Sequence, residues 1–354
     1  MMYLVTGATG HLGANLARRL LDDGLPVRVL VRATSDPAAL DGLKVERVGG
    51  DLRDADACRR AVRGCAGVYH CAAKISTMTG NNWHRREIHE CNVLGTHNLL
   101  RAALDEGVPK VVVTGSLSAI GHATDRPCNE DDPFNPFEPH LPYAVSKSGV
   151  WLECLKAFAD GLPVVVATSC AILGPNDFVP SRMGRTLIDF ANGRLRAYVP
   201  GGFEFVAVHD LVQGHLLSMA KGRPGQNYIF STRFATVDEL MGIFEQVTSR
   251  PRPRWRIPGP LMFGLARALD GLSRAFHLPG PTRFTPGAIR LLRLQRRADC
   301  GKARRELGYQ PTSIEAAIQD AYEFFARRGW IEVPRKIVGL SPSLSPRPAR
   351  SVSS

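Results

Sequence analysis

The chain has 354 residues, of which 44% are hydrophobic and 22% are charged. That length can bury a substantial core and exceeds one minimal domain, while the composition excludes a disordered acidic chain and a membrane protein. The net charge is +12, and no apolar run approaches the ~18 residues that a membrane-spanning helix needs.

The first 172 residues alternate short apolar runs with amphipathic stretches. The runs are continuously apolar, which is typical of parallel strands that are covered on both faces. Strands alternating with helices predict an α/β fold, a doubly wound parallel sheet of the Rossmann type. The expected strands are residues 3–6, 27–31, 45–48, 68–70, 110–114 and 163–168, and the expected helices are residues 11–23, 54–63, 85–106 and 143–160.

The pattern loosens after residue 172. We expect residues 1–172 to form the dinucleotide-binding core and residues 173–332 to form a smaller, mixed substrate-binding region interleaved with late Rossmann elements. Residues 333–354 are rich in proline and serine, which predicts a disordered tail. Capping boxes at residues 236–239 and 312–315 predict two helix starts. The other expected elements are extended pieces at 197–199, 205–208 and 227–230, helices at 181–192, 209–221 and 261–278, and a proline-rich loop at 250–260.

The positive charge is concentrated between residues 250 and 305, where 14 Lys and Arg accompany two acidic residues. The remaining chain carries 31 residues of each sign, because 45 less 14 and 33 less 2 are both 31. A solvated helical surface is one explanation, and contact with an anionic lipid surface or an anionic substrate is another. Nucleic acid is not an expected partner, because the region contains no recognisable nucleic-acid-binding motif.

A glycine-rich turn follows the first strand and begins the first helix. The first glycine permits the tight turn, the second lets backbone amides approach a pyrophosphate, and the third lets helix and strand pack closely. The N–H groups at the helix start can also bind an anion. This context predicts a dinucleotide site, whose expected residues are Gly7, Thr9, Gly10, His11, Leu12 and Gly13.

The strand ends that follow predict which dinucleotide is bound. Arg32 stands at the end of the second strand, where an NAD site usually has a carboxylate, so we expect NADP(H) rather than NAD(H). An exposed strand-end arginine is the alternative interpretation. After the third strand come Asp51, which is expected to reach the adenine amino group or to cap a turn, and Leu52. Ala72 and Ala73 follow the fourth strand, where small residues let the backbone pass close to the cofactor.

A tyrosine and a lysine stand four residues apart at the start of a predicted helix. This spacing places Tyr143 and Lys147 on one helix face, about one turn apart. A nearby ammonium group lowers a tyrosine pKa toward the range needed for acid–base catalysis. Ser116 and Ser118 lie at the carboxyl end of the fifth strand, where open parallel sheets bind ligands. Either hydroxyl is a candidate donor to a substrate carbonyl.

These motifs, in this order and spacing, resemble the extended short-chain dehydrogenase/reductase family. The segments that carry the resemblance over residues 2–330 are TGATGHLG, GDL, HCAA, NVLGTHNLL, the serine strand and YAVSK. The chain is most similar to the dihydroflavonol-reductase-like and 3β-hydroxysteroid-dehydrogenase-like branch. The resemblance implies that Ser116, Tyr143 and Lys147 form the catalytic triad, and that the segment from Cys170 lies along the nicotinamide ring. It also implies that Tyr143 and Lys147 contact the cofactor, with Lys147 holding its ribose hydroxyls. Asn92 matches a position often near the active site, although a helix-packing amide is an equal alternative.

The triad suits two classes of enzyme. One exchanges its cofactor and interconverts a ketone or aldehyde and a secondary alcohol. The other is a sugar-nucleotide epimerase or dehydratase, which retains NAD and needs a clamp, commonly an arginine, for the substrate diphosphate. The matching place holds Phe203 and Glu204, an apolar residue and a carboxylate that would repel a diphosphate, although Arg182, Arg185 and Arg194 are alternative clamps. Together with Arg32, this favours an oxidoreductase acting on an apolar small molecule. A non-catalytic NADP(H) sensor is a third possibility.

The remaining expectations concern location, assembly and metals. The N-terminus leads directly into a strand without a signal-peptide pattern, which predicts a cytoplasmic protein. The eight cysteines show no metal-binding spacing, so we expect reduced core thiols and no metal site. Helices 85–106 and 143–160 are a candidate surface for a homodimer. Helix 261–278 packs on the core, forms a substrate wall, or rests on a membrane surface.

Overall fold

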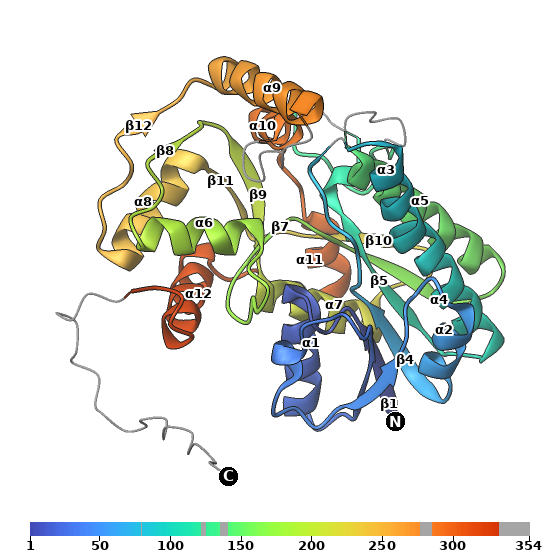
Figure 1. Cartoon of the computed structure of the whole chain (residues 1–354). Helices are drawn as coiled ribbons and strands as arrows, with labels where there is room; N and C mark the ends of the chain where they lie inside the picture. Colours follow the sequence, from blue (N-terminus) through green and yellow to red (C-terminus); the bar gives the residue numbers. More distant parts are fainter. Residues whose placement is uncertain (79, 122–124, 135–140, 277–284, 333–354) are drawn as a thin grey trace, which may run out of the picture.

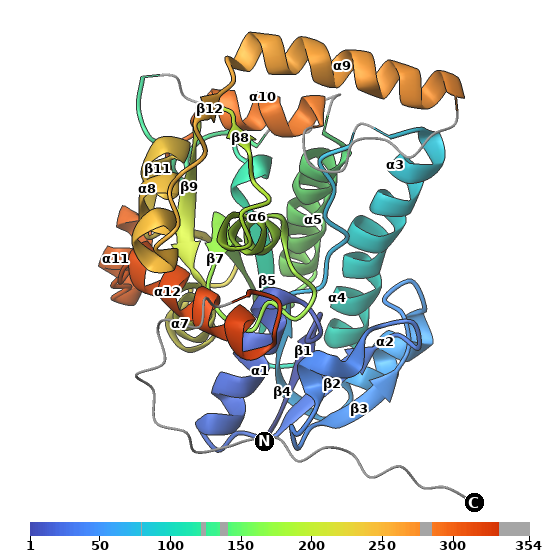
Figure 2. The same cartoon turned by 60° about the vertical axis from the view of Figure 1, so that its left-hand side comes forward.

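The computed structural model describes the chain apart from residues 79, 122–124, 135–140, 277–284 and 333–354, and for residues 269–276 only the backbone. The predicted tail therefore lies outside the described residues. The centre is a seven-stranded sheet in the order β10-β6-β5-β4-β1-β2-β3, with every neighbouring pair parallel (Figures 1 and 2). Its strands are β1 (Met2–Thr6), β2 (Val27–Val31), β3 (Glu46–Gly49), β4 (Cys65–His70), β5 (Val111–Ser116), β6 (Val164–Ser169) and β10 (Asn227–Phe230). The predicted doubly wound α/β fold is confirmed.

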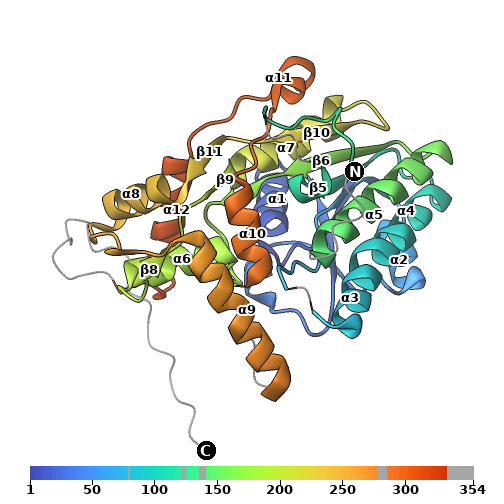
Figure 3. The same cartoon turned by 90° about the horizontal axis from the view of Figure 1, so that it is seen from above.

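Helices cover both faces of this sheet, which explains the continuously apolar strands (Figure 3). Successive strand residues point to opposite faces. Thus Val5 and Val112 belong to one core cluster, and their neighbours Leu4 and Val113 belong to the other. The first face is covered by α1 (His11–Asp22), α7 (Val208–Lys221) and α11 (Gly301–Leu307), and the second by α2 (Ala55–Val62), α4 (Gly95–Asp105) and α5 (Pro142–Ala159).

The single helix expected over residues 85–106 is interrupted. The structure contains α3 (Asn82–His89), a π-helical turn (Glu90–Leu94) and then α4. The carboxamide of Asn92, inside this turn, bonds to the backbone of Lys74 and to the Ser146 hydroxyl. A π turn inserts one residue into a helix and is common at functional sites. Here it turns an amide toward α5, which local helical periodicity does not predict.

A smaller layer packs beside the carboxyl ends of the main strands. It contains the three-stranded sheet β11-β9-β7 and the parallel pair β12–β8. The pair shows that the expected loop at 250–260 is partly wrong, because two of its residues form a strand. Phe205, Phe244 and Phe325 lie in the core of this layer. Its elements are β7 (Ala171–Leu173), β8 (Ala197–Tyr198), β9 (Gly202–Ala207), β11 (Arg233–Thr236), β12 (Trp255–Arg256), α6 (Arg182–Ala191), α8 (Val237–Thr248) and α12 (Ile314–Arg327).

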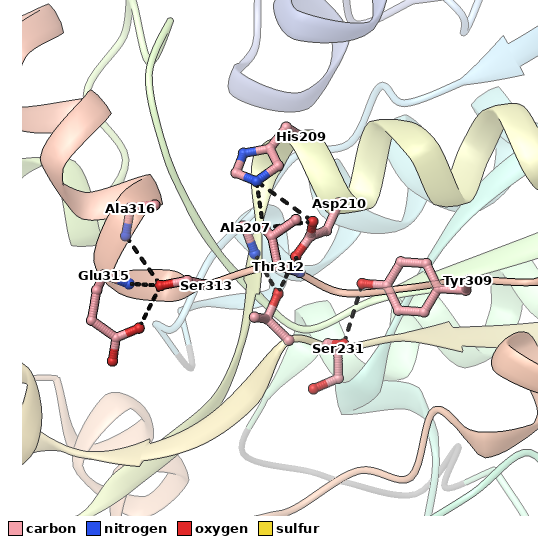
Figure 4. A network of polar contacts seen from close by, with 10 residues as sticks. Ala207, His209, Asp210, Ser231, Tyr309, Thr312, Ser313, Glu315 and Ala316 are labelled. Atoms are coloured by element: carbon pink, nitrogen blue, oxygen red, sulfur yellow. Dashed lines mark hydrogen bonds and ion pairs between the residues drawn. The ribbon is translucent and has the colours of Figure 1, made fainter.

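One of the two predicted capping boxes is present and the other is displaced. Thr236 and Glu239 form a reciprocal box at the start of α8, as expected. At α12 the N-cap is Ser313, whose hydroxyl accepts from the amides of Glu315 and Ala316. Thr312 instead donates from its hydroxyl to Asp210 Oδ1 at 2.9 Å and from its amide to Asp210 Oδ2 at 3.0 Å (Figure 4). The local pattern predicted that Thr312 caps α12, but Thr312 binds the carboxylate of Asp210, which is distant in the sequence.

Two further helices, α9 (Gly259–Phe276) and α10 (Pro286–Leu294), lie together at one end of the molecule (Figure 2). Met262 and Ala266 of α9 pack against Ile289 of α10. The helix expected at 261–278 is present as α9, as far as the described residues extend. Within those residues, no helix combines the length and apolar character that would let it cross a membrane.

Candidate active site

The glycine-rich turn lies where the strand order reverses, between β1 and β4. Ligands of doubly wound sheets bind at the carboxyl edge of this switch point. Gly7 has φ +71°, and a Cβ there would lie 2.7 Å from backbone atoms of Ala72. A Cβ on Gly13 would lie 2.2 Å from the Gly7 carbonyl oxygen. These two glycines therefore let three segments approach more closely than any side chain would permit.

The start of α1 suits an anion. Its N-cap is Gly10, which has no side chain to accept from the first amides of the helix. A helix start of this kind attracts a diphosphate through its N–H groups and its dipole. The residues present thus fit the predicted dinucleotide.

Charged side chains gather where β2 and β3 end. Arg32 is exposed directly after β2, and Asp51 follows β3. Arg53 forms a two-bond ion pair with Asp51, both bonds at 3.0 Å. This bond lowers the pKa of Asp51, and the charge of Arg32 lowers it further. From the sequence, Arg53 is less well placed for the cofactor than Arg32, and the structure pairs it with the carboxylate expected at the adenine.

The other predicted cofactor residues differ in how accessible their side chains are. Thr9, Leu52 and Ala73 are partly accessible beside the glycine turn or the neighbouring strand ends. His11 turns toward the second half of the chain, with Nε2 3.0 Å from the Pro175 carbonyl oxygen. The side chains of Leu12 and Cys170 are buried in the core of the sheet. Contact of either residue with a cofactor is therefore restricted to its backbone.

The three predicted catalytic residues are close together. β5 ends at Ser116, whose Oγ lies 2.8 Å from Ser118 Oγ. Tyr143 is in the first turn of α5, close enough to Ser116 for that hydroxyl to lower the pKa of the tyrosine. One turn later, the Nζ atom of Lys147 donates to the Thr114 carbonyl oxygen at 2.8 Å and lies 6.0 Å from the centre of the Tyr143 ring.

Burial sets the electrostatics of this group. It raises the pKa of Tyr143 to about 12, against the opposing effect of the Ser116 hydrogen bond, so the lowering of this pKa expected from Lys147 is not found. Burial also lowers the pKa of Lys147 to about 8, and no carboxylate is among the groups that offset this effect. Both shifts favour the neutral forms of the two side chains. The arrangement therefore holds a protonated tyrosine beside a hydroxyl, with an ammonium group one helical turn away.

Asn92 supports the first turn of α5. Its Nδ2 atom donates to Ser146 Oγ at 2.9 Å, and that hydroxyl donates to the Tyr143 carbonyl oxygen at 2.7 Å. Its Oδ1 atom accepts from the Lys74 amide at 2.7 Å. The sequence allowed two interpretations of Asn92, an amide that packs helices together or a residue near the active site. In the structure it is both, because it bonds to α5 beside Tyr143.

A second support for the site, which the sequence did not predict, lies on the opposite face of the sheet. The hydroxyl of Thr114 lies 2.9 Å from Nε2 of His215, whose Nδ1 atom donates to the Leu211 carbonyl oxygen. Burial lowers the pKa of His215 to about 4, so the ring is neutral. The contact joins residues 101 positions apart, and no local motif announces it.

The segment expected to hold or repel a diphosphate has a structural task. Glu204 is buried, and its carboxylate accepts from the Ser231 hydroxyl and from the Ala298 amide. These bonds occupy the Glu204 carboxylate, so it is not free to repel a diphosphate as predicted. As for metals, the part of the chain that the structure describes holds no cluster of three His, Cys, Asp or Glu suited to an ion. The absence of a metal stays a prediction.

Comparisons with known proteins agree with this arrangement. A relative from Methylococcus capsulatus, named sterol demethylase protein B, is 45% identical over 94% of this chain and 100% of its own length. A relative from Mycobacterium tuberculosis, named 3 beta-hydroxysteroid dehydrogenase/Delta 5→4-isomerase, is 30% identical over 87% of this chain and 85% of its own. The crystal structure of a dTDP-glucose 4,6-dehydratase from Streptomyces venezuelae, with NAD bound, superposes with a TM-score of 0.76, at 26% identity over 94% of this chain and 99% of that chain.

The predicted resemblance to dihydroflavonol-reductase-like and 3β-hydroxysteroid-dehydrogenase-like proteins is confirmed. The family model described as NAD dependent epimerase/dehydratase matches residues 3–230, which include the glycine turn and all three predicted catalytic residues. This chain belongs to the NAD dependent epimerase/dehydratase family.

Proposed function

We propose that this chain is an NADP(H)-dependent dehydrogenase/reductase that interconverts a ketone and a secondary alcohol on a sterol-like molecule. The observation that carries the proposal is the group formed by Ser116, Tyr143 and Lys147 at the carboxyl edge of the sheet, beside a glycine turn built for a dinucleotide. Support for the substrate class comes from the two relatives named for sterols and steroids, which agree with the apolar substrate expected from the sequence.

Each member of the group has a distinct task in this reaction. Ser116 donates a hydrogen bond to the substrate oxygen and holds it beside the tyrosine. In reduction, the Tyr143 hydroxyl gives its proton to that oxygen, and a pKa of about 12 keeps this proton available at neutral pH. In oxidation the proton returns from the alcohol to Tyr143, and the positive charge of Lys147 stabilises the phenolate that accepts it. When bound, a nicotinamide cofactor supplies or accepts the hydride.

The choice of NADP(H) rests on Arg32. A planar guanidinium at the end of β2 suits the 2′-phosphate of the adenosine ribose. The carboxylate of Asp51 already pairs with Arg53, so it contributes little net negative charge where β2 and β3 end. A site of two guanidinium groups and one neutralised carboxylate favours a phosphate over a hydroxyl.

Cofactor content separates this proposal from the sugar-nucleotide alternative. An exchanging oxidoreductase releases its cofactor on purification and binds added NADPH. An epimerase or dehydratase retains NAD, which would appear only when the protein is denatured. Tightly held NAD with no response to NADPH would overturn the proposal.

Replacing Tyr143 with Phe tests the catalytic assignment. The variant lacks the proton donor, so turnover of a 3-ketosteroid with NADPH should fall on the order of a hundredfold or more. NADPH affinity, measured by fluorescence titration, should change little. The control is Tyr322→Phe, on α12, which should keep full activity. Retained activity in Tyr143→Phe would refute the assignment, and normal NADPH binding without turnover in the unmodified chain would favour a sensor.

A further inference from the structure

The outward face of α9 is apolar where a surface helix is normally polar. One apolar face, with Met262 and Ala266, packs on α10. A second face carries Leu261 and Leu265, which are one turn apart and 66% and 50% exposed. Since the inner face already anchors the helix, packing within the chain does not explain the outer leucines.

Other exposed apolar side chains lie at the same end of the molecule. Ile75 and Met78, in the segment after β4, are 71% and 42% exposed, and Trp83 at the start of α3 is 69% exposed. The end of α3 that carries Trp83 and the helices α9 and α10 share this end in both side views (Figures 1 and 2). We call these five side chains, Ile75, Met78, Trp83, Leu261 and Leu265, the docking face.

Hydrogen bonds join the segment after β4 to α3 and to the start of α10. Thr77, between Ile75 and Met78, is hydrogen-bonded through its Oγ1 to Thr285 Oγ1, at the start of α10, at 3.0 Å. Ser76 is bonded to His84 of α3 at 2.9 Å. The segment after β4 therefore connects α3 with the start of α10, and α10 in turn packs against α9.

Three exposed arginines border this face. Arg254 precedes α9, Arg267 is on α9, and Arg293 of α10 lies against Gly259. All three are exposed, and within the described residues no ion-pair partner is recorded for them. The nearby acids Glu87 and Glu90 are instead paired with Lys74 and Arg86. Exposed leucines and a tryptophan bordered by arginines are typical of side chains that enter the interface of an anionic bilayer.

We propose that the docking face binds the surface of an anionic lipid bilayer. The apolar side chains enter the boundary between headgroups and acyl chains, and the arginines lie over the lipid phosphates. The face adjoins the candidate active site, because Gly287 of α10 packs against Leu141, two residues before Tyr143. A bilayer-bound molecule would thus present its site beside the phase in which apolar substrates dissolve. The proposal goes beyond the proposed function and does not depend on it.

Flotation with vesicles tests the proposal on the full chain. Vesicles of phosphatidylcholine and phosphatidylglycerol in equal parts should carry the protein upward at low salt, and phosphatidylcholine vesicles should carry much less. Leu261→Ser with Leu265→Ser should lower the partition coefficient on the order of tenfold, because two exposed leucines lose their burial in lipid. Arg267→Glu should weaken binding most at low salt.

Two controls keep the outcomes distinct. Leu152→Ser with Leu155→Ser removes two exposed leucines from α5, away from the docking face, and should leave flotation unchanged. Tyr143→Phe should also float normally, so that loss of activity and loss of binding are separate results. No flotation of the unmodified chain, or equal flotation of the docking-face variant, would overturn the proposal. A fall in oligomer mass caused by Leu261→Ser with Leu265→Ser, measured by light scattering without vesicles, would assign the face to a second copy of this chain instead.

Discussion

Burial shifts the pKa values of individual residues at the candidate site. Lys147 is buried without a carboxylate partner, and its ammonium group is held by the Thr114 carbonyl oxygen. Such a group costs folding free energy, since burial disfavours its charge. A surface pair of tyrosine and lysine would have neither the burial nor the lowered pKa. The structure thus distinguishes this pair from the chance occurrences of the same spacing that sequences contain.

Arg32→Ala is the residue-scale test of cofactor choice. The loss of charge-assisted hydrogen bonds to a 2′-phosphate should weaken NADPH binding on the order of ten- to a hundredfold, and NADH binding much less. Isothermal titration with both cofactors measures the difference. Arg60→Ala, an exposed arginine on α2, is the matched control and should alter neither affinity. An equal loss for NADPH and NADH would show that Arg32 does not choose between them.

At the scale of elements, long-range hydrogen bonds decide how helices and strands meet. Asp210, in the first turn of α7, accepts from the Thr232 hydroxyl at 2.7 Å and from both the amide and the hydroxyl of Thr312. The Thr232 hydroxyl in turn accepts from the Ala207 amide at the end of β9. One buried carboxylate therefore joins α7, the turn after β10 and the segment before α12 (Figure 4).

Asp210→Ala should weaken this junction. Three donors lose their acceptor, and because water can reach the exposed Thr312, the free energy of unfolding should fall by only about 1–2 kcal/mol. Urea denaturation of the two proteins measures the change. Asp210→Asn, which retains one acceptor oxygen and the shape, should lose less. Unaltered stability in Asp210→Ala would mean that water replaces the carboxylate at no cost.

At the scale of the whole molecule, the order of the strands brings the residues of the candidate site together. Because β1 and β4 are neighbours, the turns after them meet as Gly7 and Ala72, and β5 next to β4 adds Ser116 at the same edge. Behind this edge lie two histidine rings that burial keeps uncharged near neutral pH. His70 and His215 are both buried, with pKa values lowered by burial to about 3 and about 4.

The lowered pKa values of these two histidines predict that acid destabilises the fold. The unfolded chain binds their protons near pH 6.5, whereas the folded chain resists until about pH 4 or 3. Stability is therefore full above pH 6.5 and falls as the pH drops, by up to ~1.4 kcal/mol per pH unit for each ring. Urea unfolding at pH 7 and at pH 5 should reveal this loss. His215→Gln, or His70→Asn if the first variant folds poorly, should have a shallower pH dependence, and an unchanged dependence would contradict the assignment.

Sequence by itself determined the fold class, the glycine turn, and the shared helix face of Tyr143 and Lys147. Each depends on a local pattern, such as unbroken apolar strands, glycines at a turn, or a four-residue spacing, and local geometry acts within a few residues. Only the tertiary structure decided that Asn92 supports α5, that Thr312 binds Asp210 rather than capping α12, and that His215 stands behind Thr114. These contacts join residues 54, 102 and 101 positions apart, so they depend on how the elements pack, which no short window of sequence contains.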